Sequence, residues 1–267
     1  MESRRADSAQ AQSSSKQRVD KTRTALGSYN VHEMNDDESA RGNSIRESSD
    51  EVFAARLRGF GPLGLLAIVL IFLGNGLFLP GSALLVLLWV HLSQTPWREI
   101  GFVRPKSWLR LVALGILFGV TFKFLMKSIV MPLLGADPIN HAYHYLTGNR
   151  AAIPITLYAM IAGAGFGEET MFRGFMFERL HKLFGTSVAA KVAIVVITSV
   201  LFGLAHYRVQ GLTGTEQATI VGLVFGTVFA VTGRIFLLMI AHAAFDLTAY
   251  AMIYWDLETR VAHLLFK

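Results

Sequence analysis

The 267-residue chain contains no cysteine, and only 16% of its residues are charged. The lack of cysteine excludes disulfides, thiolate metal sites and a cysteine nucleophile. Acidic residues are scarce after the first fifty-odd positions, because ten of the 19 precede Gly59. With 52% hydrophobic residues and a mean hydropathy of +0.44, the chain is too apolar for a soluble protein of this size. The composition indicates an integral membrane protein.

The net charge of +6 comes from cations that flank apolar runs in the part of the chain after Gly59. Such placement is typical of the ends of membrane spans. A nucleic-acid-binding face would instead carry its cations in a stripe with interleaved aromatic residues. We therefore predict membrane lipids as partners and no nucleic acid.

Residues 1–55 are predicted to form a disordered polar tail, and residues 56–267 a transmembrane helical domain. The tail is rich in Ser, Asp, Glu, Arg and Gln and almost free of aromatic residues. It cannot bury enough apolar surface to offset the entropy lost on ordering. It does not resemble a secretory signal, because the first apolar run begins only near Phe60.

The domain is predicted to be an all-α, polytopic transmembrane helical bundle of about seven spans, within a range of six to eight. Each span is judged against the roughly 20 helical residues that cross a bilayer. Pro80 and Gly81 favour a hairpin over one long helix through 60–93, although the number of spans there is left open. Two spans would place the cation-rich loops on the side of the tail, which predicts an N-terminus inside the cell. The predicted spans are residues 60–79, 81–93, 109–134, 152–178, 188–206, 215–232 and 234–255.

Two adjacent carboxylates and a guanidinium lie within the fourth of these apolar segments: Glu168, Glu169 and Arg173. Such groups are costly when unpaired in hydrocarbon, so they are expected to face a protein-lined or water-filled interior. Glu169 and Arg173 are four residues apart and can form a structural ion pair, while Glu168 points about 100° away. A purely structural pair leaves the second glutamate unexplained. Glu168 is therefore the predicted general base, acting on water.

Two further apolar segments each contribute ionisable groups. His206 ends the fifth segment, and His242 and Asp246 lie four residues apart in the last one. That spacing puts both side chains on one helix face, where the carboxylate can orient the imidazole or share a ligand with it. Burying these groups separately would be costlier than gathering them, so we predict one common site.

The three motifs in this order resemble those of the CAAX protease and bacteriocin-processing family of intramembrane proteases, also called the CPBP or ABI family. The resemblance extends to the architecture of about residues 60–255. Members of this family often carry Asn at the last motif position, where this chain has Asp246. The motifs are Glu-Glu-x-x-x-Arg at 168–173, Phe-x-x-x-His at 202–206 and His-x-x-x-Asp at 242–246.

The resemblance implies a set of catalytic residues. Glu168 would activate the hydrolytic water, with Glu169 assisting in the site. His206 and His242 would position that water or stabilise the oxyanion, and Asp246 would help. The acidic residue at the last position favours a charged partner for His242.

The cofactor is left open between zinc and none, because the family has been described both as metalloproteases and as glutamate-dependent proteases. His206, His242 and Glu168 could supply the three protein ligands of a catalytic zinc site. Without zinc, the same groups provide a general base and hydrogen-bond donors, and this is the preferred mechanism. The residues Asp137, His141 and His144 also have metal-like spacing, but turn chemistry in the loop 135–150 explains them.

We predict an intramembrane endopeptidase of a bacterial cytoplasmic membrane that hydrolyses a membrane-associated or lipidated, CAAX-type peptide or protein. The alternative is a catalytically silent membrane protein for peptide binding or bacteriocin immunity. A transporter is the third interpretation, and the lack of an internal repeat argues against it. Lys123 and Lys127 share a helix face and are expected to reach the outer interface or face protein rather than bind substrate.

Overall fold

The computed structural model describes residues 49–266 of a chain that divides into two units, Met1–Ala55 and Arg56–Lys267. A helix occupies Ser49–Arg58, and the rest of the predicted disordered tail lies outside the described residues. The described residues form helices and loops and contain no β-strand, which confirms the all-α prediction.

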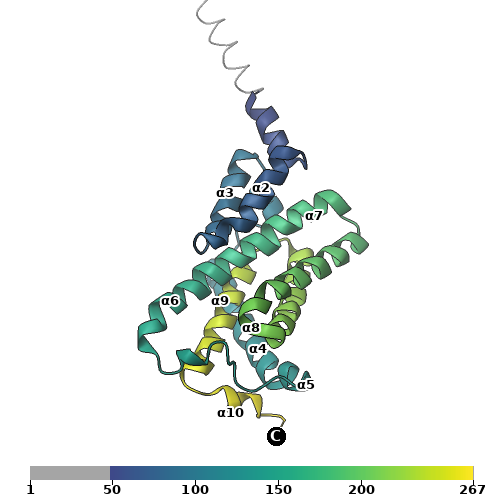
Figure 1. Cartoon of the computed structure of the whole chain (residues 1–267). Coiled ribbons are helices and arrows are strands. Elements are labelled where there is room, and N and C mark those ends of the chain that lie inside the picture. Colours follow the sequence, from purple (N-terminus) through teal and green to yellow (C-terminus); the bar gives the residue numbers. More distant parts are fainter. Residues whose placement is uncertain (1–48, 267) are drawn as a thin grey trace, which may run out of the picture. The chain divides into compact units, whose positions relative to one another are not determined.

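The second unit is a bundle of helices of very different lengths (Figure 1). Wider π-helical turns at Met126–Val130, Ala159–Glu168 and Thr170–Phe175 continue the α-helices next to them. In chain order the helices are α2 (Pro62–Leu73), α3 (Gly81–Leu92), α4 (Trp108–Leu125), α5 (Met131–Leu133), α6 (Ile153–Tyr158), α7 (Met176–Phe184), α8 (Val188–Thr232), α9 (Phe236–Tyr254) and α10 (Glu258–Ala262).

Among the described residues, four continuous helices are long and apolar enough to cross a membrane, and the protein is an integral membrane protein. A fifth is counted if Ser49–Arg58 and Pro62–Gly76 together form one bent span. The prediction of a polytopic helical bundle is confirmed. The four helices are Trp108–Leu133, Arg150–Phe184, Val188–Thr232 and Phe236–Tyr254.

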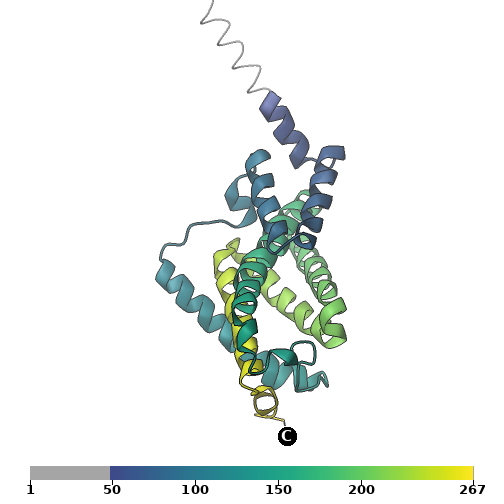
Figure 2. The ribbon, with the colours of Figure 1, turned by 60° about the vertical axis from the view of Figure 1, so that its left-hand side comes forward.

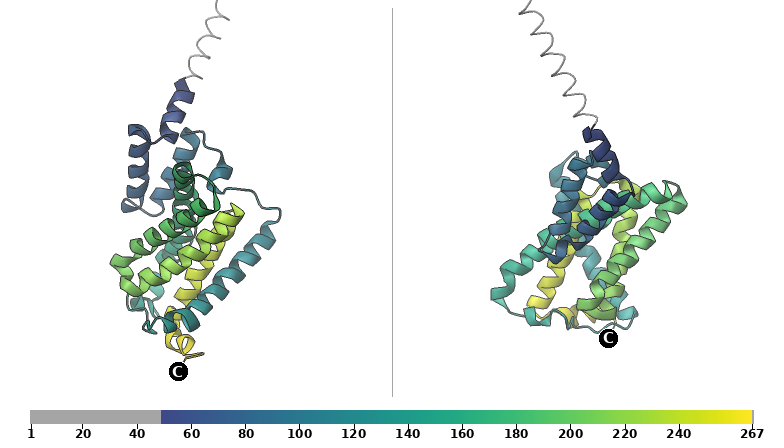
Figure 3. Two further views of the ribbon diagram at one scale, coloured as in Figure 1. Left: turned by 90° about the vertical axis from the view of Figure 1, so that its right-hand side faces the viewer. Right: turned by 45° about the horizontal axis from the view of Figure 1, so that its top comes forward.

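The spans predicted at 188–206 and 215–232 form the two halves of α8. Gly211, with φ 64° and ψ −159°, breaks the helix between them. The second half then returns along the first, because a Cβ added to Gly222 would lie 2.9 Å from Ser199 Cα. Figure 3 shows the two halves side by side. Gly211 therefore turns one 45-residue helix into two antiparallel segments.

The segments predicted as spans at 60–79 and 81–93 differ from the prediction in length. Helices α2 and α3 have 12 residues each, or about 18 Å, against a hydrocarbon core of about 30 Å. They form a short hairpin rather than two full spans. Asn75 and Ser82 exchange hydrogen bonds across its turn, from each backbone N–H to the other side chain, at 3.0 and 2.9 Å. This pairing satisfies polar groups at the tip of the hairpin.

Helix α9 packs between α4 and the π-helix Ala159–Glu168 (Figure 2). Glycines permit the close approach, because a Cβ on Gly119 would lie 2.9 Å from Ala244 Cβ. A Cβ on Gly165 would lie 2.8 Å from Met239 O. Association of helices in a membrane depends on such tight packing, since lipid tails are as apolar as the side chains. The small residues therefore bring the π-helix and α9 close together.

Hydrogen bonds between loops define the two ends of the bundle. At the α7–α8 end, Ile235 N–H donates to Gly101 O at 3.0 Å. At the α10 end, Gly148 N–H donates to Tyr254 O at 3.0 Å, and Gln210 beside the α8 break donates to Tyr143 in the loop 135–149. The two ends are thus each held together by contacts of loops with other loops or helix residues that are distant in sequence.

Candidate active site

The two π-helical stretches of the helix Arg150–Phe184 meet at the glutamates of the first motif, because Glu168 ends the first stretch and Glu169 lies between the two. π-Helical turns are uncommon and are frequent at functional sites. The two side chains have different surroundings: Glu169 has no exposed surface, whereas the Glu168 side chain is 27% exposed. Glu168 is therefore the carboxylate that is open to solvent or substrate.

Glu169 forms a sealed network with two cationic or ionisable partners. Its Oε1 accepts hydrogen bonds from Arg173 at 2.9 Å and from His242 Nδ1 at 2.7 Å. The Arg173 guanidinium also lies 4.6 Å from the Phe202 ring centroid, within cation–π range. The ion pair expected from the spacing of Glu169 and Arg173 is present, and it extends to the histidine of another helix.

The network fixes the orientation of the His242 ring. With Nδ1 bound to Glu169, Nε2 points to the other side, 3.8 Å from Glu168 Oε2 and 3.8 Å from Asp246 Oδ2. From the sequence, Asp246 could either orient this ring or share a ligand with it. The hydrogen bond at Nδ1 comes from Glu169, because the glycine contact at Gly165 brings its helix within hydrogen-bond distance of α9.

His206 lies at the end of the first half of α8, where the second motif predicted it. Its Nδ1 lies 2.8 Å from the backbone oxygen of Phe202. Because a carbonyl oxygen can only accept, Nδ1 carries the proton of this hydrogen bond. In the neutral ring, Nε2 is then a hydrogen-bond acceptor.

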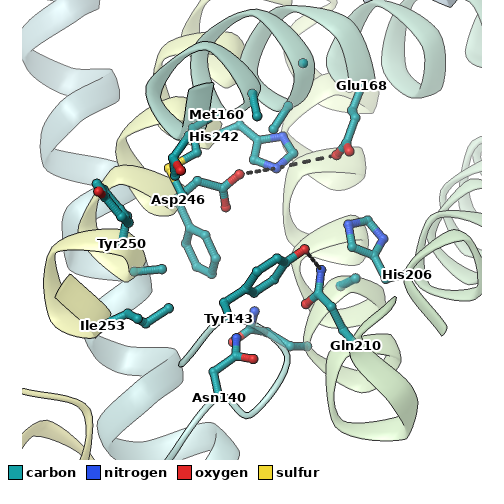
Figure 4. Close-up of a pocket in the computed structure, with 18 of the residues that line it drawn as sticks. Asn140, Tyr143, Met160, Glu168, His206, Gln210, His242, Asp246, Tyr250 and Ile253 are labelled. Carbon is teal, nitrogen blue, oxygen red and sulfur yellow. Dashed lines mark hydrogen bonds and ion pairs between the residues drawn. The ribbon is translucent and has the colours of Figure 1, made fainter. Parts of the chain in front are cut away.

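A cavity of about 370 Å³ brings four of the five predicted catalytic residues together: Glu168, His206, His242 and Asp246. Figure 4 shows these side chains around a common space, with His242 between the two carboxylates. Glu169 does not line the cavity and acts behind it, through His242. Glu168 Oε2 has no hydrogen-bond partner within residues 49–266. A carboxylate oxygen thus remains available beside an oriented imidazole.

Residues 150–248 match the family model for type II CAAX prenyl endopeptidase Rce1-like proteins. This segment of the chain is therefore similar to Rce1-like proteins. This agrees with the resemblance to the CPBP family, and the matched segment includes all three motifs. No curated protein and no solved structure matches the chain. The Rce1-like domain supports assignment of the chain to membrane-embedded endopeptidases that act on peptide or protein substrates.

The cavity is completed by residues that the motifs did not identify. Tyr143 lines the same cavity from the loop 135–149, and its hydroxyl accepts from Gln210 Nε2 at 3.3 Å. Burial, and then the negative charge of Asp246, raise the pKa of Tyr143 above its usual value. The hydroxyl therefore keeps its proton at neutral pH and remains a donor. Nothing in the sequence periodicity predicts where this loop residue would lie.

A second cavity, of about 470 Å³, adjoins the first and shares Glu168 and His206 with it. The α2–α3 hairpin lines it with Phe72, Asn75 and Ser82, and the first half of α8 lines the opposite side. Glu168 and His206 therefore lie at the junction of two cavities. The short hairpin, outside the Rce1-like segment, contributes to the surroundings of the site.

Among residues 49–266, no three His, Asp or Glu side chains lie close enough together to hold a metal ion. The candidate ligands Glu168, His206 and His242 line one cavity but do not form such a group, so their arrangement does not fit a zinc site. In the loop, Asp137 accepts from Ile139 N–H at 2.8 Å and lies 3.1 Å from His141 Nε2. The hydrogen bond from Ile139 is the main cause of the lowered pKa of Asp137. These contacts agree with the turn chemistry predicted for this loop.

Proposed function

We propose that the protein is an intramembrane endopeptidase in which Glu168 activates the hydrolytic water. The substrate is a membrane-associated or lipidated, CAAX-type peptide or protein. The observation that carries this proposal is that the two glutamates have different surroundings. Glu169 is fully buried and bound to Arg173 and His242. The Glu168 side chain is instead 27% exposed and lines the cavity, and its Oε2 has no hydrogen-bond partner among residues 49–266.

The proposed reaction begins when Glu168 takes a proton from water as the water oxygen attacks the scissile carbonyl carbon. His206 Nε2 accepts a hydrogen bond from the same water and so helps to orient it. The carbonyl oxygen gains negative charge, and hydrogen-bond donors in the cavity stabilise it. Tyr143 supplies an O–H donor, and His242 donates from Nε2 when that nitrogen carries a proton.

The intermediate collapses when the carbon–nitrogen bond breaks. Glu168 returns its proton to the leaving nitrogen, so the carboxylate is regenerated. The products are a new amine and a new carboxylic acid, which loses its proton to solvent. Glu169 and Arg173 touch neither the water nor the substrate in this scheme and keep the His242 ring in position.

The test is cleavage of membrane-bound and lipidated peptides in liposomes by the native chain and by the Glu168→Gln variant. General-base catalysis contributes about 10²- to 10⁴-fold, so cleavage by the variant should fall by that factor while its fold is retained. Glu99→Gln is the matched control, because Glu99 is exposed and lines none of the three cavities. Activity retained in Glu168→Gln would refute the assignment.

The proposed location is a bacterial cytoplasmic membrane, with the N-terminus inside. Loops at the α7–α8 end carry the cations Arg98, Arg104, Lys106 and Arg234. The loop 135–150 at the other end carries one cation, Arg150. The positive-inside rule therefore supports placing the α7–α8 end in the cytoplasm.

A further inference from the structure

We propose that Lys123 binds a carboxylate group of the substrate in the active-site cavity. This inference rests on the proposed function and concerns the same cavity. Lys123 lies on α4 and is 6% exposed, and it lines the cavity that holds Glu168, His206 and His242. A cation is thus buried in the wall of the substrate site, on a helix outside the Rce1-like segment.

Lys127, one turn further along the chain, shows how a buried lysine is neutralised in this protein. Its Nζ lies 2.9 Å from Glu258 Oε1, and it also donates to the Pro138 carbonyl oxygen. Lys127 therefore faces protein, which is one of the two placements expected from the sequence. Its charge is compensated by a carboxylate of the α10 end.

Lys123 forms no direct ion pair among residues 49–266, although the carboxylates of Asp246 and Glu258 act on its charge from a longer distance. Its Nζ donates to Gln217 Oε1 at 3.1 Å and lies 4.7 Å from the Phe245 ring centroid. An amide oxygen and an aromatic face are neutral partners, and a buried charge is costly unless an opposite charge is nearby. A carboxylate that enters the cavity would provide the direct ion pair that neither Asp246 nor Glu258 makes with Lys123.

A second buried polar group in the same cavity, the Tyr250 hydroxyl, lacks a hydrogen-bond partner among the described residues. The Tyr250 side chain is 7% exposed, and within the described residues its hydroxyl has no hydrogen-bond partner. Tyr250 lines the cavity together with Lys123 and Gln217. An ammonium and a hydroxyl can both donate to a carboxylate, which accepts several hydrogen bonds.

The carboxylate has two chemical sources in a peptide. It is either the free C-terminus of a chain that ends near the scissile bond, or the side chain of an Asp or Glu. Both would place a negative charge beside Lys123. In either case, Lys123 determines which peptides bind in the productive register.

The experiment measures kcat/KM in liposomes for three matched peptides. The first has a free C-terminus, the second has a C-terminal amide, and the third is the amide with one Glu in place of Gln near the cleavage site. The native chain should prefer a carboxylate-bearing peptide over the neutral amide by at least about tenfold. Preference for the first peptide identifies the C-terminus, and preference for the third identifies a side chain.

In Lys123→Met, the ratio of kcat/KM for the carboxylate-bearing peptide to kcat/KM for the neutral amide should fall to about one. This substitution keeps the length of the side chain and removes its charge. Lys106→Met is the matched control, because Lys106 is exposed and lines none of the three cavities, and its preference should equal that of the native chain. An unchanged preference in Lys123→Met, or no preference in the native chain, would overturn the proposal. Equal losses on charged and neutral peptides would assign Lys123 to charge balance within the protein instead.

Binding separates this inference from the proposed function. The Glu168→Gln variant, which should not cleave, is titrated with the acid and amide peptides with and without Lys123→Met. Tighter binding of the acid that depends on Lys123 supports the inference even if the native chain cleaves neither peptide. Equal binding of acid and amide refutes it, whatever the activity of the native chain.

Discussion

Arg173 shows why a charged residue can lie in the middle of an apolar segment without touching the substrate. It is 2% exposed and donates to Glu169, which in turn holds His242. The three side chains come from two helices, and the Glu169 carboxylate accepts hydrogen bonds from the other two. A structural ion pair and a catalytic site are therefore parts of one network here, rather than alternatives.

We predict that Arg173→Met destabilises the protein by about 3–5 kcal/mol, because it leaves the buried Glu169 carboxylate without its cation. Thermal unfolding in detergent measures this loss. The double variant Glu169→Gln with Arg173→Met removes both charges and should recover part of the stability. A single variant as stable as the native chain would show that the pair contributes little.

At the scale of elements, the π-helix and α9 must approach closely for His242 to reach Glu169. Gly165 lies at this contact, where an added Cβ would be 2.8 Å from Met239 O and 3.0 Å from Ala243 Cβ. Contacts this short force neighbouring atoms to move. The glycines of the first motif segment therefore set the geometry of the site as well as the packing.

We predict that Gly165→Ala lowers kcat/KM by at least about tenfold and destabilises the protein by about 1–3 kcal/mol, because α9 must shift away from the π-helix. Cleavage assays and thermal unfolding measure the two effects. Gly76→Ala is the matched control, since an added Cβ there meets nothing within 4 Å. Native activity in Gly165→Ala would mean that the helix contact does not position His242.

The sequence predicted the long helices well, because apolar runs of about 20 residues bounded by polar loops determine them. It did not predict the π-helical turns, since the same residues suit an α-helix of ordinary pitch. It also treated the segment at 81–93 as a span, whereas α3 has only 12 residues. Hydropathy reports that a segment is apolar, but the depth to which it enters the membrane depends on its partners.

The sequence also predicted part of the candidate site. Because burying ionisable groups separately is costly, Glu168, His206 and His242 were expected to share one site. The structure places them around one cavity. The partner of His242 Nδ1 was not predictable from spacing, because Glu169 reaches it from another helix. Tyr143 lies on a loop, so its position depends on contacts that no sequence periodicity encodes.

At the scale of the whole molecule, the contacts between loops determine which segments share a membrane face. Thr186 follows α7 at one end, and Thr259 lies in α10 at the other. Both residues are exposed.

A short hairpin at α2–α3 returns the chain to the face it left, as two full spans would also do. The predicted N-terminus inside therefore does not depend on whether this hairpin crosses the bilayer.

We predict that a membrane-impermeant thiol reagent added to intact cells labels Thr259→Cys and does not label Thr186→Cys. Because the native chain has no cysteine, each variant carries a single thiol and the background is zero. Opening the cells should make Thr186→Cys reactive, which verifies that its thiol is accessible. The opposite labelling pattern would invert the topology and place the loop 135–149, with Tyr143, on the cytoplasmic side. The cavity residues would then receive substrates from the cytoplasm through the α10 end.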